Sequence, residues 1–160
     1  MPPQRLSVRK IVSGGQTGAD RAALDFARDR NFEHGGWVPA GRLAEDGPVA
    51  AWYGLVETPS AEYEQRTEWN VRDSDATLIV ATGPLTGGSA LTLALARKHG
   101  KPVLHADCTD ARLRDAAGTV RDWLNEHRPR VLNVAGPRES TTPGMYEVVR
   151  SLLERVFSED

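Results

Sequence analysis

Short apolar segments alternate along this chain with longer stretches in which apolar residues recur at helical spacing. The apolar segments have the length of strands, and the stretches between them are long enough for helices. This alternation predicts an α/β fold, a Rossmann-like doubly wound sheet of about five mainly parallel strands with helices on both faces. The predicted strands are residues 8–13, 36–39, 76–81, 102–106 and 131–135.

Helix boundaries are predicted from capping residues. Ser60, Ser89 and Thr142 each precede a helical pattern and are expected as N-caps, with Pro143 in the first position of the last helix. Helices are expected for residues 17–29, 61–72 and 90–99, within 114–127 with a candidate break at Gly118, and from residue 143 onward. Residues 39–60 are rich in Pro and Gly and form an irregular segment of the kind that is usually functional, with a candidate hairpin at 52–57.

Two glycine-rich segments, residues 13–20 and 83–89, each follow a predicted strand and open a predicted helix. A strand order of 2-1-3-4-5 would bring both to the carboxyl edge of the sheet, where ligands bind in doubly wound folds. The first segment lacks the GxGxxG spacing and a Walker lysine. Its remaining feature is a backbone nest for a phosphate or another oxyanion, and the alternative is a tight turn without a ligand. The candidate binding residues in the two segments are Gly14, Gly15, Gln16, Thr17, Gly18, Thr86, Gly87, Gly88 and Ser89.

Asp20 follows the first glycine segment and allows several interpretations. A carboxylate in the first turn of a helix stabilises the helix dipole. It could also accept two hydrogen bonds from an amino-pyrimidinone edge, as in guanine or a pterin, or hold a metal beside a phosphate. Ser89 could equally be a simple N-cap.

A polar face on the predicted helix 61–72 suggests a pocket wall. A helix face that packs on a sheet is usually apolar, whereas this one is polar and aromatic. The alternative is that this face points to solvent, with Trp69 anchoring the opposite side. The face consists of residues at i, i+3, i+4 and i+7, namely Tyr63, Arg66, Thr67 and Asn70.

Arg138 follows the fifth predicted strand and could bind a phosphate through two nitrogens. It could instead pair with Glu139 or Glu147.

Composition narrows the function classes. The 160 residues are 39% hydrophobic and 26% charged, which predicts a single domain over residues 1–160. The net charge of −2 provides no basic surface for nucleic acid or an anionic membrane. No apolar stretch approaches the ~20 residues that span a bilayer, and the single cysteine and the absence of a signal region favour the cytoplasm. The four histidines have no metal-ligand spacing, so we predict no metal site. The sequence shows no paired carboxylates, no Ser–His or Cys–His arrangement and no general base apart from Asp20, so we also predict no catalytic residues.

Several motifs resemble, in the same order, those of the molybdenum carrier protein family. The resemblance covers nearly the whole chain. The motifs are SGGQTGADRAALD at 13–25, GGWVP at 35–39, RTEWNVRDSD at 66–75, GPLTGGS at 83–89 and NVAGPRES at 133–140.

The resemblance implies a Rossmann-like domain related to nucleotide-ligand sensors and to cytokinin-activating phosphoribohydrolases. It also implies a homo-oligomer, dimer or tetramer, that binds the molybdenum cofactor without catalysis, with the phosphate at the glycine segments and a molybdoenzyme as acceptor. The phosphoribohydrolase signature PGGxGTxxE is absent, because Gly87-Gly88-Ser89 is not followed by Gly-Thr and the catalytic glutamate. The alternatives are a sensor for a nucleotide-derived ligand such as ADP-ribose, or a nucleoside monophosphate N-glycosidase with Asp20 as acid or base.

Overall fold

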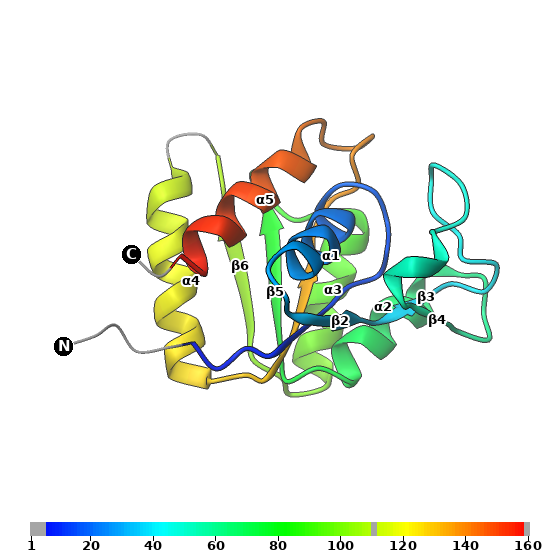
Figure 1. Cartoon of the computed structure of the whole chain (residues 1–160), viewed down its shortest axis with the longest axis horizontal. Coiled ribbons are helices and arrows are strands. Elements are labelled where there is room, and N and C mark those ends of the chain that lie inside the picture. The colour runs from blue at the N-terminus through cyan, green and yellow to red at the C-terminus, as the bar shows by residue number, and fades with distance from the viewer. Residues whose placement is uncertain (1–5, 110–111, 159–160) are drawn as a thin grey trace.

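The computed structural model describes residues 6–109 and 112–158, and it contains a main parallel sheet with helices on both of its faces (Figure 1). The strands are β1 (Lys10–Val12), β2 (Glu33–Gly35), β3 (Trp37–Val38), β4 (Val56–Glu57), β5 (Ala76–Ala81), β6 (Val103–Asp107) and β7 (Val131–Ala135). The helices are α1 (Ala19–Asp29), the 3-10 turn η1 (Ala51–Tyr53), α2 (Tyr63–Arg72), α3 (Gly87–Lys98), α4 (Leu113–His127) and α5 (Met145–Val156). This arrangement confirms the predicted α/β Rossmann-like fold.

The order of the main sheet is β2-β1-β7-β5-β6, and all of its pairs are parallel. The predicted order 2-1-3-4-5 is wrong, because the last strand lies between the first and the third predicted strands. In the register, Leu132 of β7 faces Ile11 of β1, and Val134 faces Leu78 of β5. Placing β7 and α5 ahead of β1 in the chain would turn this order into 3-2-1-4-5, that of Rossmann folds. The strand order therefore reverses between β7 and β5, where a ligand is expected.

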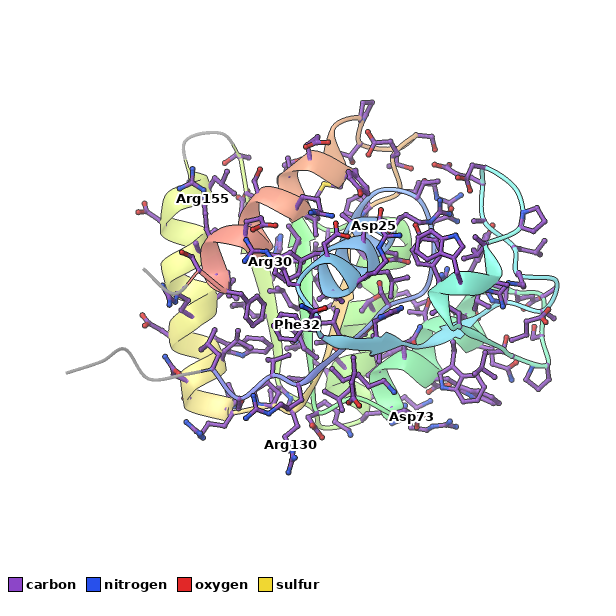
Figure 2. The ribbon with its side chains drawn as sticks, in the orientation of Figure 1. Asp25, Arg30, Phe32, Asp73, Arg130 and Arg155 are labelled. Atoms are coloured by element: carbon purple, nitrogen blue, oxygen red, sulfur yellow. The ribbon has the colours of Figure 1, made fainter. Side chains whose placement is uncertain are left out.

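The main core lies between the sheet and the layer formed by α1, α4 and α5 (Figure 1). Phe32, after α1, packs in it against Phe26 and Phe157, with ring centroids 5.9 and 5.0 Å away (Figure 2). Helices α2 and α3 cover the opposite face of the sheet.

The strand predicted at 36–39 is wrong for the main sheet, because Gly36, with a φ of 131°, separates two short strands, and the one in the main sheet ends before it. Residues before it form β2 in the main sheet, and Trp37–Val38 pairs with β4 in a separate two-stranded sheet. The hairpin expected at 52–57 is also wrong, because η1 occupies its first residues and β4 runs parallel to β3. The two paired strands β3 and β4 are thus joined by a long connection and not by the tight turn of a hairpin.

The segment between β3 and α2 packs on α1 through a second, small core that contains Leu24, Val38, Val49 and Leu55. Asp25 of α1 reinforces this contact (Figure 2). Its carboxylate accepts hydrogen bonds from the hydroxyl of Tyr53 in η1 at 2.7 Å and of Tyr146 in α5 at 2.5 Å.

None of the three predicted N-caps is the residue directly before its helix, although the Ser60 hydroxyl accepts a hydrogen bond from the Glu62 N–H at 3.0 Å. Helix α2 begins at Tyr63 after Glu62, and α3 begins at Gly87, which places Ser89 inside its first turn. Helix α5 begins at Met145, after Gly144 in the left-handed conformation.

A carboxylate from outside the helix takes the capping role at α5. Glu139 accepts hydrogen bonds from the backbone N–H of Gly144 at 2.7 Å and of Tyr146 at 3.0 Å. Helix α4 runs through Gly118 without a break.

Candidate functional site

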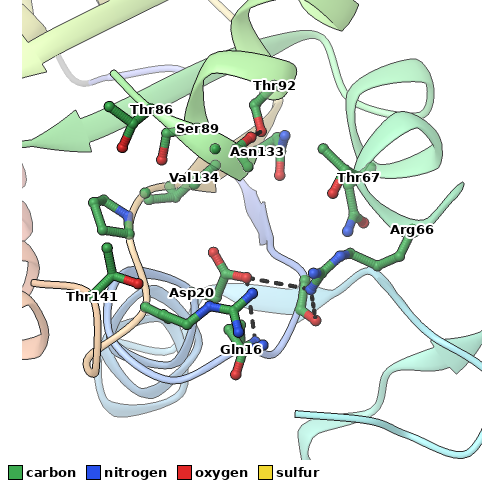
Figure 3. Close-up of a pocket in the computed structure, with 18 residues that line it drawn as sticks. Gln16, Asp20, Arg66, Thr67, Thr86, Ser89, Thr92, Asn133, Val134 and Thr141 are labelled. Atoms are coloured by element: carbon green, nitrogen blue, oxygen red, sulfur yellow. Dashed lines mark hydrogen bonds and ion pairs between the residues drawn. The ribbon is translucent and has the colours of Figure 1, made fainter. Parts of the chain in front are cut away.

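A pocket of about 250 Å³ opens at the carboxyl ends of β1, β7 and β5 (Figure 3). Its walls come from the turn after β1, the turn after β7, the N-terminus of α3 and the polar face of α2. The two glycine segments therefore face one pocket, although β7 separates their strands. The predicted site residues that line it are Gly14, Gln16, Asp20, Arg66, Thr67, Asn70, Thr86, Gly87, Gly88, Ser89 and Arg138.

Four predicted site residues lie behind this lining. A Cβ on Gly15 would point at Leu55 and Val49 of the small core, and one on Gly18 would lie 2.6 Å from the Pro137 carbonyl oxygen. The Thr17 hydroxyl donates a hydrogen bond to Glu45. The Tyr63 ring lies against two arginines described below. These four residues therefore support the pocket wall from behind and do not line the pocket.

Several N–H groups of the turn after β1 are already engaged within the protein. The Gln16 N–H donates to the Asp20 carboxylate, the Thr17 N–H to the Gln16 side-chain oxygen, and the Ala19 N–H to the Pro137 carbonyl. Gly14 has another role, because a Cβ there would lie 2.6 Å from Cδ of Arg66. The absence of a side chain at Gly14 therefore makes room for Arg66.

Arg66 and Asp20 form a buried ion pair in the pocket wall (Figure 3). Arg66 Nη1 lies 3.6 Å from Asp20 Oδ2 and donates a hydrogen bond of 2.6 Å to the Gly14 carbonyl. Burial raises the pKa of Asp20, and the positive charge of Arg66 opposes this rise. Burial lowers the pKa of Arg66, and the negative charge of Asp20 opposes this fall. The polar face of α2 therefore faces the protein interior, and the alternative that it points to solvent is wrong for Arg66 and Asn70.

The N-terminus of α3 is the more open anion-binding element. Thr86 is its N-cap residue and makes no side-chain capping hydrogen bond, and no acidic residue stands in the first turn. The N–H groups of Gly87 and Gly88 have no protein partner among the described residues. A Cβ on either glycine would meet no atom within 4 Å. Free N–H groups, a helix dipole and open space together suit a phosphate.

Arg138 adds positive charge at the same pocket. Its guanidinium lies 5.4 Å from the centre of the Tyr63 ring, and that of Arg66 lies 5.1 Å from it. No carboxylate of the described residues lies within ion-pair distance of Arg138, so neither Glu139 nor Glu147 pairs with it. Asp20 is the acidic residue in the pocket lining, and Arg66 already faces it. The second guanidinium is therefore available to an anion.

Two polar residues of the predicted α2 face are engaged within the protein. The Asn70 side chain accepts a hydrogen bond from the Trp37 N–H at 2.8 Å and donates one to the Trp37 carbonyl at 3.0 Å. The Thr67 hydroxyl donates to the carbonyl of Tyr63 in its own helix. Asn70 thus joins α2 to the start of β3.

Part of the pocket lining escaped the sequence prediction. The turn after β7 lies at the centre of the site, because β7 lies where the strand order reverses. Asn133 is buried there, and its side-chain NH2 donates to the Thr77 hydroxyl at 3.3 Å. The motif that ends strand β7 was visible in the sequence, but its central position required the strand order. The lining residues not predicted are Thr92, Asn133, Val134, Ala135, Gly136, Pro137 and Thr141.

Glu45 joins the long segment after β3 to both turns behind the pocket. Its carboxylate accepts hydrogen bonds from the hydroxyls of Thr17 and Ser140, the latter at 2.5 Å, and its N–H donates to the Gln16 side-chain oxygen at 2.8 Å. The Ser140 and Thr17 hydroxyls hold the pKa of Glu45 below its usual value. A neighbouring ion pair between Arg21 of α1 and Asp46 also holds the segment after β3 in place.

Replacing Glu45 with alanine is expected to loosen residues 39–50 without unfolding the protein. Loss of these exposed contacts removes about 1 kcal/mol of local stability, so amide hydrogen exchange there should accelerate about fivefold. Because the pKa of Glu45 is lowered on folding, the contact is present above its unfolded-state pKa and is lost as the pH falls through the folded-state value. Glu62→Ala is the matched exposed control and should leave this exchange unchanged. Equal exchange in both variants would contradict the role given to Glu45.

Among residues 6–109 and 112–158, no group of three or more His, Cys, Asp or Glu side chains could hold a metal ion. In the same part of the chain, no helix combines the length and the apolar character needed to cross a membrane.

Comparison with known proteins agrees with this geometry. A crystal structure from Syntrophus aciditrophicus SB, described as a "Putative molybdenum carrier protein" at 1.45 Å resolution, is 50% identical and superposes with a TM-score of 0.93. The alignment covers 97% of this chain and 98% of that one, which confirms the resemblance seen in the motifs. No curated protein matches the chain. The profile of the circularly permutated YpsA SLOG family matches residues 11–157, and the central position of the last strand is what a permuted chain order predicts. These findings support a role in binding a nucleotide-like ligand, and the chain belongs to the circularly permutated YpsA SLOG family.

Proposed function

We propose that this protein binds the molybdenum cofactor, a pterin with a phosphate group, and carries it unchanged to an acceptor enzyme. The observation that carries the proposal is the open N-terminus of α3 at the strand-order reversal, with the unpaired Arg138 beside the same pocket. A phosphate there accepts hydrogen bonds from the Gly87 and Gly88 N–H groups and lies in the field of the helix dipole. Arg138 supplies the balancing charge.

The rest of the pocket suits a polar ring system rather than an apolar ligand. Gln16 Nε2 and Arg66 Nε are buried nitrogens without a hydrogen-bond partner in the described protein, and both residues line the pocket. Buried donors without protein partners are rare, and these two make this part of the pocket wall polar. The related protein from Syntrophus aciditrophicus is described as a molybdenum carrier, and this supports the molybdenum cofactor as the ligand.

Replacing Gly88 with valine is expected to abolish binding of molybdopterin while leaving the fold intact. The new side chain has room in the unliganded protein, because a Cβ on Gly88 meets no atom within 4 Å, but it would occupy the phosphate position. Binding is measured as the shift in thermal unfolding upon adding molybdopterin, AMP or ADP-ribose. A ligand at 100 times its dissociation constant adds about 2.7 kcal/mol to stability.

Gly118→Ala is the control, because Gly118 is an exposed glycine of α4, outside the pocket lining. It should bind molybdopterin like the unmodified protein. Unchanged binding by Gly88→Val would remove the α3 N-terminus from the site. Tighter binding of ADP-ribose than of molybdopterin would favour a nucleotide sensor, and release of free adenine from AMP would favour an N-glycosidase.

A further inference from the structure

The first turn of α3 carries four hydrogen-bond donors that the described protein leaves free. Two are the N–H groups of Gly87 and Gly88, and the other two are the hydroxyls of Thr86 and Ser89. Figure 3 shows both hydroxyls at the α3 end, pointing into the pocket. Because the four residues are consecutive, their donors gather at one end of the helix.

Ser89 distinguishes this turn from an ordinary helix end. The residue is only 6% exposed, yet it lines the pocket. Its hydroxyl keeps surface accessible from the pocket, whereas Gln16 Nε2 and Arg66 Nε in the same lining have almost none. A helical side chain leans toward the N-terminus, so the hydroxyl of this third helical residue lies near the free N–H groups. A buried hydroxyl usually has a partner within the protein, and here a ligand can supply it.

The pocket also holds more positive charge than its acidic residue balances. Asp20 is the acidic residue of the described lining and faces Arg66 at 3.6 Å, so these two charges compensate each other. Arg138 has no carboxylate within ion-pair distance among the described residues. The N-terminus of α3 contributes about +0.5 through the helix dipole, which brings the unbalanced charge to about +1.5.

We infer that this site takes a terminal phosphate, a phosphomonoester dianion, and not a phosphate that is esterified on both sides. A phosphomonoester carries about −1.5 to −2 charges at pH 7 and offers three free oxygens to the donors. A phosphodiester carries a single negative charge and offers two free oxygens. The bridging phosphates of ADP-ribose and the ring phosphates of cyclic nucleotides are diesters or anhydrides of this second kind. The inference rests on the phosphate site proposed above, and it restricts the ligand class to molecules that end in a phosphate.

The test titrates methyl phosphate and dimethyl phosphate into the unmodified protein, labelled with nitrogen-15, at pH 7. The two probes share a tetrahedral phosphate and differ by one ester. The amide signals of Gly87 and Gly88 in proton–nitrogen correlation spectra report binding at the α3 end directly. Methyl phosphate should shift both signals and bind at least about tenfold more tightly than dimethyl phosphate, because the diester lacks the second charge and one acceptor oxygen.

Ser89→Ala removes the buried hydroxyl and separates binding from folding. The affinity for methyl phosphate should fall about tenfold. The midpoint of thermal unfolding should not fall, because the hydroxyl loses no protein partner and alanine is the better helix former. Ser151→Ala is the matched control, since Ser151 is an exposed serine of α5 outside the pocket lining, and it should keep the affinity. A lowered midpoint with unchanged affinity in Ser89→Ala would show that the hydroxyl supports the fold and would contradict the inference.

The outcomes distinguish this inference from the proposed function. Equal affinity for the two esters, abolished in Gly88→Val, would overturn the choice of a monoester and leave the phosphate site in place. Methyl phosphate that leaves both glycine amides unshifted would overturn the inference. If molybdopterin also leaves them unshifted, the proposed phosphate site at α3 is overturned with it.

Discussion

Replacing Arg66 with methionine is expected to lower the free energy of unfolding by about 3 kcal/mol at neutral pH, since a buried ion pair loses one partner. Methionine retains most of the apolar stem that passes Gly14, so the change removes the charge more than the packing. It leaves the Asp20 carboxylate buried without its cation and the Gly14 carbonyl without its 2.6 Å hydrogen bond. Urea unfolding at pH 7 measures the loss.

The loss should depend on pH in a defined direction. Burial raises the pKa of Asp20, and removal of Arg66 takes away the charge that opposes this rise. A carboxyl whose pKa is raised on folding stabilises the protein at low pH, and this contribution disappears as the pH rises through the folded-state value. The difference between Arg66→Met and the unmodified protein should therefore shrink on acidification.

A second substitution separates the charge from the other contacts of Arg66. In Asp20→Asn/Arg66→Met, no carboxylate is left without a partner at this position, so the double variant should be more stable at pH 7 than Arg66→Met alone. The difference between the double variant and Asp20→Asn should not change with pH. A loss below about 1 kcal/mol for Arg66→Met would contradict a structural role for the ion pair.

Local sequence patterns predicted the elements of this fold better than their neighbours in space. The apolar segments at 76–81 and 131–135 are strands β5 and β7 as expected. Their adjacency was not predicted, because hydrophobic spacing reports burial and is silent about which strands pair. The chain order favoured sequential pairing, and the permuted order of this family places β7 in the middle instead.

The same contrast, between local patterns and neighbours in space, explains which features of the site were predicted. Arg66 was predicted because it lies on a polar and aromatic helix face where a face that packs on a sheet is usually apolar, and the structure places it in the pocket wall. The contact of Gly14 with Arg66 was not predicted, since it joins residues 52 positions apart. Glycine spacing alone does not distinguish space for a ligand from space for a side chain of the protein.

Glu139 shows why the sequence alone did not predict where helix α5 begins. Thr142 and Pro143 form a good N-terminal signal, yet the Glu139 carboxylate binds the N–H groups of Gly144 and Tyr146, and the helix begins at Met145. A turn that already supplies a capping carboxylate overrides the local preference.

Replacing Gly136 with alanine is expected to destabilise the protein by about 3 kcal/mol, the upper part of the usual range for an overpacked site. Gly136 follows β7 at the strand-order reversal. A Cβ there would collide with the Val80 carbonyl oxygen and lie 2.7 Å from Cβ of Ala19. These atoms belong to the backbone of β5 and to the first residue of α1, so neither can move aside as a flexible side chain could.

Gly118→Ala is the matched control for this change, since Gly118 is an exposed helical glycine whose Cβ would meet no atom within 4 Å. It should raise stability by about 1 kcal/mol through helix propensity. Denaturant unfolding of both variants compares the same chemical change at a crowded and an open position. Because Arg138 follows Gly136 by two residues, the displaced turn should also weaken phosphate binding in Gly136→Ala. Equal stability of the two variants would show that the turn after β7 can shift away from β5, and the close packing inferred at the centre of the site would then be wrong.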